Sequence, residues 1–269
     1  MHAAPRIRGV SKRRCDVSLW ASAAALPLAS HASAILVNLE PNAWLTMAEP
    51  IRRSLAADAM LHTAGCAIVA APLAGVAAVA RRRLVSEDGG LTGNLTGVVP
   101  ALTIAAALFT TVSSVISMMW LAGQPGATSL VVQAHATVLS VALALAGWGA
   151  LCAAWFRDPL DAAGCSLVTV LVAACGLLVG GATVSDLSPT TLSWGLTASP
   201  LMVIASAAQI DLVRMDVLYQ ISPLAHIQFE YPSWQRACAS YTAVTFACFL
   251  AVRSKSRTWF ANPRPERTI

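Results

Sequence analysis

The chain has 269 residues, of which 57% are hydrophobic and only 12% carry a formal charge. Soluble domains carry roughly a quarter charged residues, so this composition excludes an ordinary soluble domain and predicts an integral membrane protein. The net charge of +5 does not indicate nucleic-acid binding, because the arginines and lysines lie in short clusters beside apolar runs, a pattern typical of membrane topology.

Long runs without formal charge divide the chain. The clearest are 54–80 (broken only by Asp58), 89–156, 162–185 and 237–252. About 20 helical apolar residues cross the hydrocarbon core of a bilayer. Continuous apolar runs favour helices over the alternating pattern of a barrel strand. We therefore expect an all-α polytopic membrane helix bundle.

Six spans are expected within a transmembrane domain of residues 17–252. Gly123-Gln124-Pro125-Gly126 is predicted to be a turn between the third and fourth spans. Asp158-Pro159 is predicted to break the helix after the fourth span, and the sixth span is expected to stop at Arg253. The expected spans are 17–38, 60–80, 98–122, 128–156, 164–184 and 236–252.

The first span, 17–38, is the weakest of the six because it contains Pro27 and His31. A basic start, an apolar run and the small residues at 32–34 also resemble a signal peptide. The run is longer than a usual signal core and shows no clear cleavage site, which favours a true span. Without it, five spans would remain and the mature N-terminus would lie outside.

The basic residues near the span ends predict an orientation. With the N-terminus inside, 14 of the 18 lysines and arginines lie on the inner side, in the tails 1–16 and 253–269, in the triplet at 81–83 and at Arg157. We therefore expect both termini in the cytoplasm and the protein in the cell membrane, specifically the inner membrane, of a bacterium.

The segment 185–235 lies on the outer side in this topology. Ser199-Pro200 is a helix-start signal, with the proline at the first helical position. The run 201–210 is apolar but too short to cross a bilayer. We expect a re-entrant or interfacial helical element between the fifth and sixth spans, and we take this segment as the candidate functional region.

No catalytic, nucleotide-binding or metal-binding motif is found: the sequence has no Walker A pattern, no HExxH and no GxSxG. The span interiors contain no Asp, Glu, Lys or Arg, which argues against a proton-coupled transporter with a carboxylate relay. We predict no catalytic residues, no cofactor and no metal site, and no enzyme activity in this chain. A lipid-acting enzyme would need clustered polar groups near an interface; the nearest are Asp211, Asp216, His226 and Glu230. Asp211 is also spaced to pair with Arg214.

Three histidines lie in or near the spans: His31, His62 and His135. Each is either a proton or ligand site or a neutral histidine bonded to a backbone carbonyl or polar side chain, and we favour the second interpretation. Gly176 and Gly180 form a GxxxG pattern that marks either a dimer face or ordinary packing within the bundle.

The inner loop 84–97 is glycine-rich. It is either a contact surface for a cytoplasmic partner or a flexible solvated linker, with the linker favoured. Its glycosylation sequon, Asn94-Leu95-Thr96, lies on the cytoplasmic side in the expected topology, so we discount it.

The order of these features resembles the membrane subunit of ABC-2-type exporters, mainly over 165–255. That family has six spans, cytoplasmic termini and a short re-entrant or interfacial element between the fifth and sixth spans. The weak first span, with no clear amphipathic helix ahead of it, departs from the family pattern. The residues that carry the resemblance are Leu187-Ser188-Pro189, Ala198-Ser199-Pro200, Leu218-Tyr219, Ser222-Pro223, Tyr231-Pro232 and Trp234.

The resemblance implies a permease subunit that forms the transmembrane pathway of an ABC-type exporter and is driven by a separate ATP-binding cassette subunit. It implies a homo- or heterodimer of permeases in the lipid bilayer, with the first and fifth spans near the dimer interface and the coupling contact in the loop 81–97. The alternative is a non-transporting integral membrane scaffold, or a regulatory or assembly protein.

Overall fold

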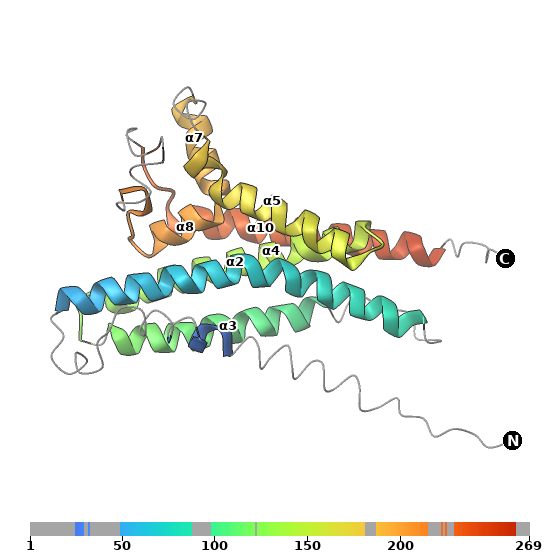
Figure 1. The fold of residues 1–269 in the computed structure, drawn as a ribbon, viewed down its shortest axis with the longest axis horizontal. Coiled ribbons are helices and arrows are strands. Elements are labelled where there is room, and N and C mark those ends of the chain that lie inside the picture. Colours follow the sequence, from blue (N-terminus) through green and yellow to red (C-terminus); the bar gives the residue numbers. More distant parts are fainter. Residues whose placement is uncertain are drawn as a thin grey trace, which may run out of the picture.

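The computed structural model describes residues 25–29, 32, 49–87, 98–121, 123–180, 187–214, 222, 224 and 229–261. These residues form helices and short connections, with no strand among them. The long helices run along one axis, so the fold is an all-α helix bundle (Figure 1). In chain order the elements are α2 (Glu49–Glu87), α3 (Val98–Trp120), α4 (Ala127–Trp155), α5 (Pro159–Val179), α7 (Pro189–Ala198), α8 (Pro200–Ala207), the 3₁₀ helix η2 (Leu212–Arg214) and α10 (Trp234–Ala261).

Five of the described helices are long and apolar enough to cross a membrane, and the chain is therefore an integral membrane protein. The predicted first span, 17–38, lies outside the described residues except for 25–29 and 32, which are helical, so the count of six spans stays a prediction. The five candidate spans are Ala56–Arg83, Val98–Trp120, Ala127–Trp155, Pro159–Val179 and Trp234–Lys255.

Helices α3 and α4 lie within two residues of the spans expected at 98–122 and 128–156. The predicted turn separates them. Gly123 and Gly126 have φ angles of 81° and 78°, values in the left-handed region that glycine adopts without steric strain. The two glycines therefore explain why the chain reverses within so few residues.

Helices α2 and α10 extend beyond the spans expected at 60–80 and 236–252. The sixth span was expected to stop at Arg253, and the helix that contains it, α10, continues to Ala261. A charged residue ends the stretch that lipid can cover, but arginine and lysine are good helix formers, so the backbone hydrogen bonds continue into the aqueous layer.

Helix α5 begins five residues before the span expected at 164–184 and ends five residues before its end. The Asp158 carboxylate accepts a hydrogen bond from the Leu160 backbone N–H at 2.8 Å, and Pro159 occupies the first turn. Both features are typical of a helix start. Asp158-Pro159 therefore begins α5 three residues after α4 has ended, which leaves a short connection.

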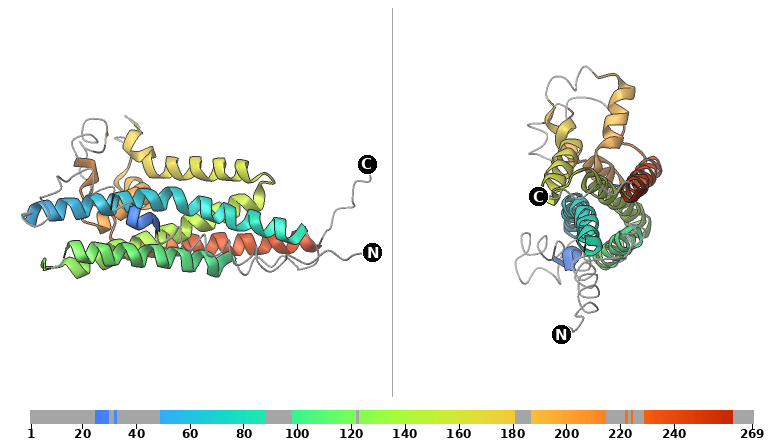
Figure 2. Two further views of the ribbon diagram at one scale, coloured as in Figure 1. Left: turned by 60° about the horizontal axis from the view of Figure 1, so that its bottom comes forward. Right: turned by 90° about the vertical axis from the view of Figure 1, so that its right-hand side faces the viewer.

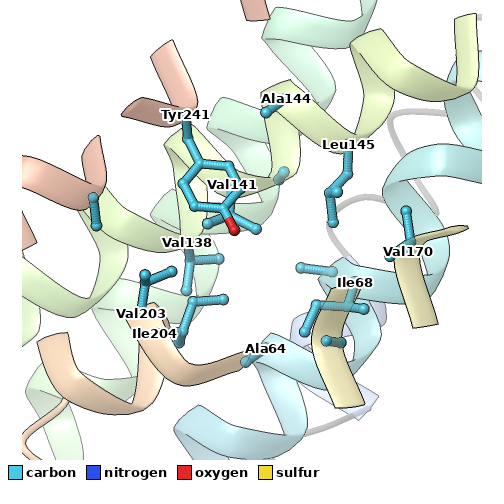
Figure 3. Close-up of a cluster of buried hydrophobic side chains, with 14 of the residues drawn as sticks. Ala64, Ile68, Val138, Val141, Ala144, Leu145, Val170, Val203, Ile204 and Tyr241 are labelled. Atoms are coloured by element: carbon cyan, nitrogen blue, oxygen red, sulfur yellow. The ribbon is translucent and has the colours of Figure 1, made fainter. Parts of the chain in front are cut away.

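Helix α4 is the centre of the bundle. Buried residues make up 72% of its span but only 22–28% of the spans in α3, α5 and α10, and it packs against all the other long helices and α8 (Figure 2). The core around it joins Val138, Val141 and Leu145 of α4 with side chains from α2, α5, α8 and α10 (Figure 3). The lipid-facing helices are therefore arranged around a buried one.

Helices α2 and α4 approach most closely at two glycines. A Cβ atom added to Gly149 would lie 2.0 Å from the carbonyl oxygen of Pro72, and one added to Gly75 would lie 2.0 Å from that of Ala146. Small residues let membrane helices approach until their backbones touch. No side chain larger than hydrogen fits at either position in this packing.

Candidate functional site

The segment between α5 and α10 forms a pair of short helices, α7 and α8. Ser188 caps α7 by accepting a hydrogen bond from the Thr191 N–H at 3.2 Å. Ser199 ends α7 and caps α8, where its hydroxyl accepts from the Met202 N–H at 3.4 Å. Pro200 follows in the first turn of α8, which confirms the predicted helix start. The chain therefore changes direction at a single residue, Ser199.

Helix α8 ends abruptly although the apolar run continues to Ile210. Gln209 has a φ angle of 57°, the Ile210 N–H donates to the Ala205 carbonyl at 2.8 Å, and the Gln209 N–H donates to the Ser206 carbonyl at 3.0 Å. This pair of bonds is the Schellman motif, which usually places glycine in the left-handed position. A glutamine occupies it here.

Three hydrogen bonds show that α7 and α8 enter the bundle and leave it again. Going in, the Arg236 guanidinium of α10 donates to Ser193 at 3.1 Å. At the turning point the Tyr241 hydroxyl donates to the Ala198 carbonyl at 2.9 Å. Coming out, the Ser206 hydroxyl donates to the carbonyl of Pro232, just before α10, at 2.9 Å. At 1.5 Å per helical residue, the turning point lies about 10 Å along α10 from its first residue.

On the side away from α10, the helical pair contacts α5. The Ser199 hydroxyl donates to the Ala174 carbonyl at 3.0 Å, five residues before α5 ends at Val179. On α7, a Cβ added to Gly195 would lie 3.1 Å from the Leu177 side chain. Polar side chains of the pair thus bond to backbone carbonyls of the bundle, which satisfies groups that lipid cannot hydrate.

Burial distinguishes the two helices. In α8, every residue from Met202 to Ala205 is at most 1% exposed, and the helix packs against α2, α4, α5, α7 and α10. In α7, Trp194 is 60% exposed and lies under the Arg236 guanidinium, with 4.7 Å between the guanidinium carbon and the ring centroid. Helix α8 is an internal part of the bundle, whereas α7 forms its edge.

The described charged residues of the 185–235 segment do not converge into a reactive cluster. Asp211 accepts a hydrogen bond from the Tyr231 hydroxyl at 2.8 Å, and Glu230 is exposed. Asp216 and His226, and the side chain of Arg214 with which Asp211 was expected to pair, lie outside the described residues. In the described part of the chain, no group of three His, Cys, Asp or Glu residues could hold a metal ion.

The histidines have ordinary partners where they are described. The exposed His62 bonds through Nδ1 to the Asp58 carbonyl at 2.8 Å. His135 is buried; its Nδ1 bonds to the Val131 carbonyl at 2.8 Å and its Nε2 to Ser113 of α3 at 3.0 Å. Because a carbonyl only accepts, Nδ1 carries the proton and Ser113 donates to Nε2. His31 lies outside the described residues.

Besides the His135–Ser113 contact between α4 and α3, a polar contact joins α4 to α10. The Cys238 sulfur lies 3.7 Å from the Thr137 hydroxyl and 3.5 Å from the Ser140 hydroxyl. Sequence reasoning did not identify this contact or the Tyr241 bond. The sequence did indicate that Tyr241 would form a hydrogen bond, since a buried hydroxyl inside an apolar span needs a partner.

The expected packing role of the GxxxG pattern in α5 is not seen at Gly176. A Cβ added there would meet only Val172 of its own helix, at 3.9 Å. The close helix approaches involve single glycines of α2 and α4 instead. A dimer face at Gly176 and Gly180 stays a prediction.

The bundle end opposite α7 and α8 is basic. Six described side chains there are basic and two, Asp158 and Asp161, are acidic; the basic ones are Arg81, Arg82, Arg83, Arg157, Arg253 and Lys255. Arg83 of α2 donates to the Phe156 carbonyl at 2.8 Å and also to the Ala153 carbonyl. A cation at the carbonyl end of a helix is favourable, so Arg83 fastens the end of α2 to the end of α4. Most of the loop 84–97 lies outside the described residues.

The chain matches no protein-family model, no curated protein and no solved structure. The described site contains hydroxyl–carbonyl bonds and apolar packing, and its described charged side chains, Asp211, Glu230 and Arg236, are exposed. Such an arrangement positions a short helical pair at the end of the bundle without burying a described charge.

Proposed function

We propose that the chain is the permease subunit of an ABC-2-type exporter, forming the transmembrane pathway and driven by a separate ATP-binding cassette subunit. The observation that carries the proposal is the pair of short helices α7 and α8, which bonds to α5 through Ser199 and to α10 through Tyr241. A short helical pair at this place in the chain is the feature that resembled these permeases in the sequence.

The basic end of the bundle supports the proposed orientation. Lysine and arginine are enriched on the cytoplasmic side of membrane proteins, so the end with Arg83, Arg157 and Arg253 is the cytoplasmic one in this proposal. Helices α7 and α8 then lie on the outer side. The loop after α2 lies beside the ATP-binding subunit, and Arg83 transmits its displacement to the end of α4.

The interior of the bundle supports an external source of energy. Its buried polar side chains in α3 and α4 are neutral serines, threonines and a histidine bonded to a serine. Ion-coupled transporters use intramembrane acidic or basic residues, and the span interiors of this chain contain none. Transport would therefore be powered by ATP hydrolysis in a partner.

Alternating access would require the outer end of the pathway to open. The contacts of the pair with α10, namely Arg236 to Ser193 and Tyr241 to Ala198, are the ones that would break in that step. The neutral Tyr241–Ala198 bond contributes about 1 kcal/mol and the Arg236–Ser193 bond, with its charged donor, at most about 3 kcal/mol, so these bonds are strong enough to position the pair and weak enough to exchange.

Purification from native membranes in a gentle detergent tests the proposal. We expect the tagged chain to retain a protein with a Walker A motif, together with ATPase activity that disappears when the Walker lysine of that protein is replaced. A chain that purifies alone, or with partners that bind no nucleotide, contradicts the exporter proposal and favours a membrane scaffold.

A further inference from the structure

The connection between α4 and α5, at the basic end, exposes a cation between apolar side chains. Arg157 is exposed and has no hydrogen bond or ion pair with any residue that the structure describes. Beside it, Trp155 is 68% exposed and Leu160 is 79% exposed. An arginine that contacts only water has no use for exposed apolar neighbours, so the tryptophan and leucine beside Arg157 require an explanation.

The length of the connection sets the depth of Arg157. The residue is two positions from Trp155, where one candidate span ends, and two from Pro159, where the next begins. An extended chain covers at most about 3.6 Å per residue, so its Cα lies within about 7 Å of both helix ends. Each headgroup layer of a bilayer is about 5–7 Å thick. Tryptophan at a span end is typical of the membrane interface, and with Trp155 at that level the guanidinium reaches the lipid phosphates.

The local charge favours a phosphate. Arg83 lies on the same turn through its bonds to the Phe156 and Ala153 carbonyls, and one of the two carboxylates there, Asp158, accepts from the Leu160 N–H. Six described basic side chains at this end thus outnumber two carboxylates, Asp158 and Asp161. Guanidinium groups bind phosphate through charge-assisted hydrogen bonds.

We propose that this turn, formed by Trp155, Phe156, Arg157 and Leu160, binds an anionic phospholipid. Arg157 contacts the headgroup phosphate, and the exposed tryptophan and leucine contact the glycerol and the upper acyl chains. A soluble protein partner is not favoured, because a three-residue connection does not extend past the headgroup layer. The lipid site is independent of transport and holds for any membrane role of the chain.

Native mass spectrometry of the full chain in detergent with equal amounts of phosphatidylglycerol and phosphatidylcholine tests the proposal. We expect the native protein to retain phosphatidylglycerol preferentially. We expect Arg157→Gln to lower that retention severalfold, because it removes the guanidinium that contacts the headgroup phosphate through charge-assisted hydrogen bonds. The matched control is Arg253→Gln, an exposed arginine of α10 at the same end, which is expected to keep the preference.

A second variant tests the apolar part of the surface. Trp155→Ala is expected to lower the retention of both lipids while leaving their ratio unchanged. Helical circular dichroism shows whether each exposed-site variant is folded. Equal retention of the two lipids by the native chain, no change in Arg157→Gln, an equal loss in Arg253→Gln, or no effect of Trp155→Ala would each overturn the proposal.

Discussion

The close approach of α2 and α4 gives the sharpest stability prediction. In Gly149→Ala the new methyl group would lie 2.0 Å from the Pro72 carbonyl oxygen and 2.7 Å and 2.9 Å from two further backbone atoms of Pro72, whereas real Cβ contacts are not shorter than 3.0 Å. Since all three atoms belong to the backbone, no side-chain rotation relieves the clash, and α2 must move away from α4.

Overpacking of a tight core costs roughly 1–3 kcal/mol, and a clash with backbone belongs at the upper end of that range. Alanine regains about 1 kcal/mol of helix propensity over glycine. We therefore expect Gly149→Ala to lower the free energy of unfolding by about 2 kcal/mol. The measurement is unfolding of the purified protein in mixed micelles with increasing denaturing detergent, followed by helical circular dichroism.

Gly164→Ala is the matched control, because a Cβ at Gly164 meets nothing within 4 Å. Its helix propensity alone predicts a gain of up to about 1 kcal/mol. Gly75→Ala prevents the same close helix approach from the side of α2, so it should lower the free energy of unfolding as much as Gly149→Ala. In the double variant the loss of stability should be less than the sum of the two single losses. If Gly149→Ala is as stable as the native chain, or no worse than Gly164→Ala, the described α2–α4 packing is wrong.

Three further predictions follow from the hydrogen bonds and the turn geometry. Gln209→Gly should stabilise the protein by about 1 kcal/mol, because a non-glycine residue in the left-handed region costs about that much; a lower melting temperature would contradict the Schellman ending of α8. Ser113→Ala should cost about 1–3 kcal/mol, the penalty for a buried ring nitrogen left without a donor, and equal melting curves would show that the bond to the histidine is not formed. In a chain whose other cysteines are replaced, Thr137→Cys should form a disulfide with Cys238 on oxidation, since the two side chains are in contact, whereas Val132→Cys on the exposed face should not; peptide mapping identifies the product.

The apolar runs predicted the long helices well, and their exact ends less well. Helices α3 and α4 end near tryptophans and a glycine-rich turn, which are local signals that the sequence displays. The loss of hydrophobicity at Arg253 indicated where the apolar run ends but not where α10 ends, since the helix continues to Ala261. Asp158-Pro159 was interpreted as a helix break, whereas Asp158 caps α5 and Pro159 lies in its first turn, both local signals of a helix start.

The candidate site was partly predictable. Ser199 and Pro200 predicted the start of α8, and the short apolar run indicated that this helix would not cross the bilayer. Its abrupt end was not visible, since Gln209 is not the glycine that usually marks such an ending.

Contacts between residues that are distant in sequence could not be predicted from local sequence patterns. Ser113 and His135 lie 22 residues apart on different helices. Their contact depends on how α3 and α4 rotate against each other. The tight approach of Gly75 and Gly149 depends on the same kind of packing, and among the many small residues of this chain nothing local distinguishes these two glycines.

In the proposed mechanism the chain is an ATP-driven permease in which α7 and α8 form the moving outer part. ATP hydrolysis by the reconstituted complex is the most direct test of this mechanism. Ser193→Cys and Arg236→Cys, introduced together into a cysteine-free chain, allow a short reducible cross-linker to join α7 to α10 at the contact seen in the structure. We predict that cross-linking suppresses ATP hydrolysis, that reduction restores it, and that Ser193→Cys alone is unaffected. An absence of associated ATP hydrolysis, or an unchanged rate after cross-linking, would contradict this account.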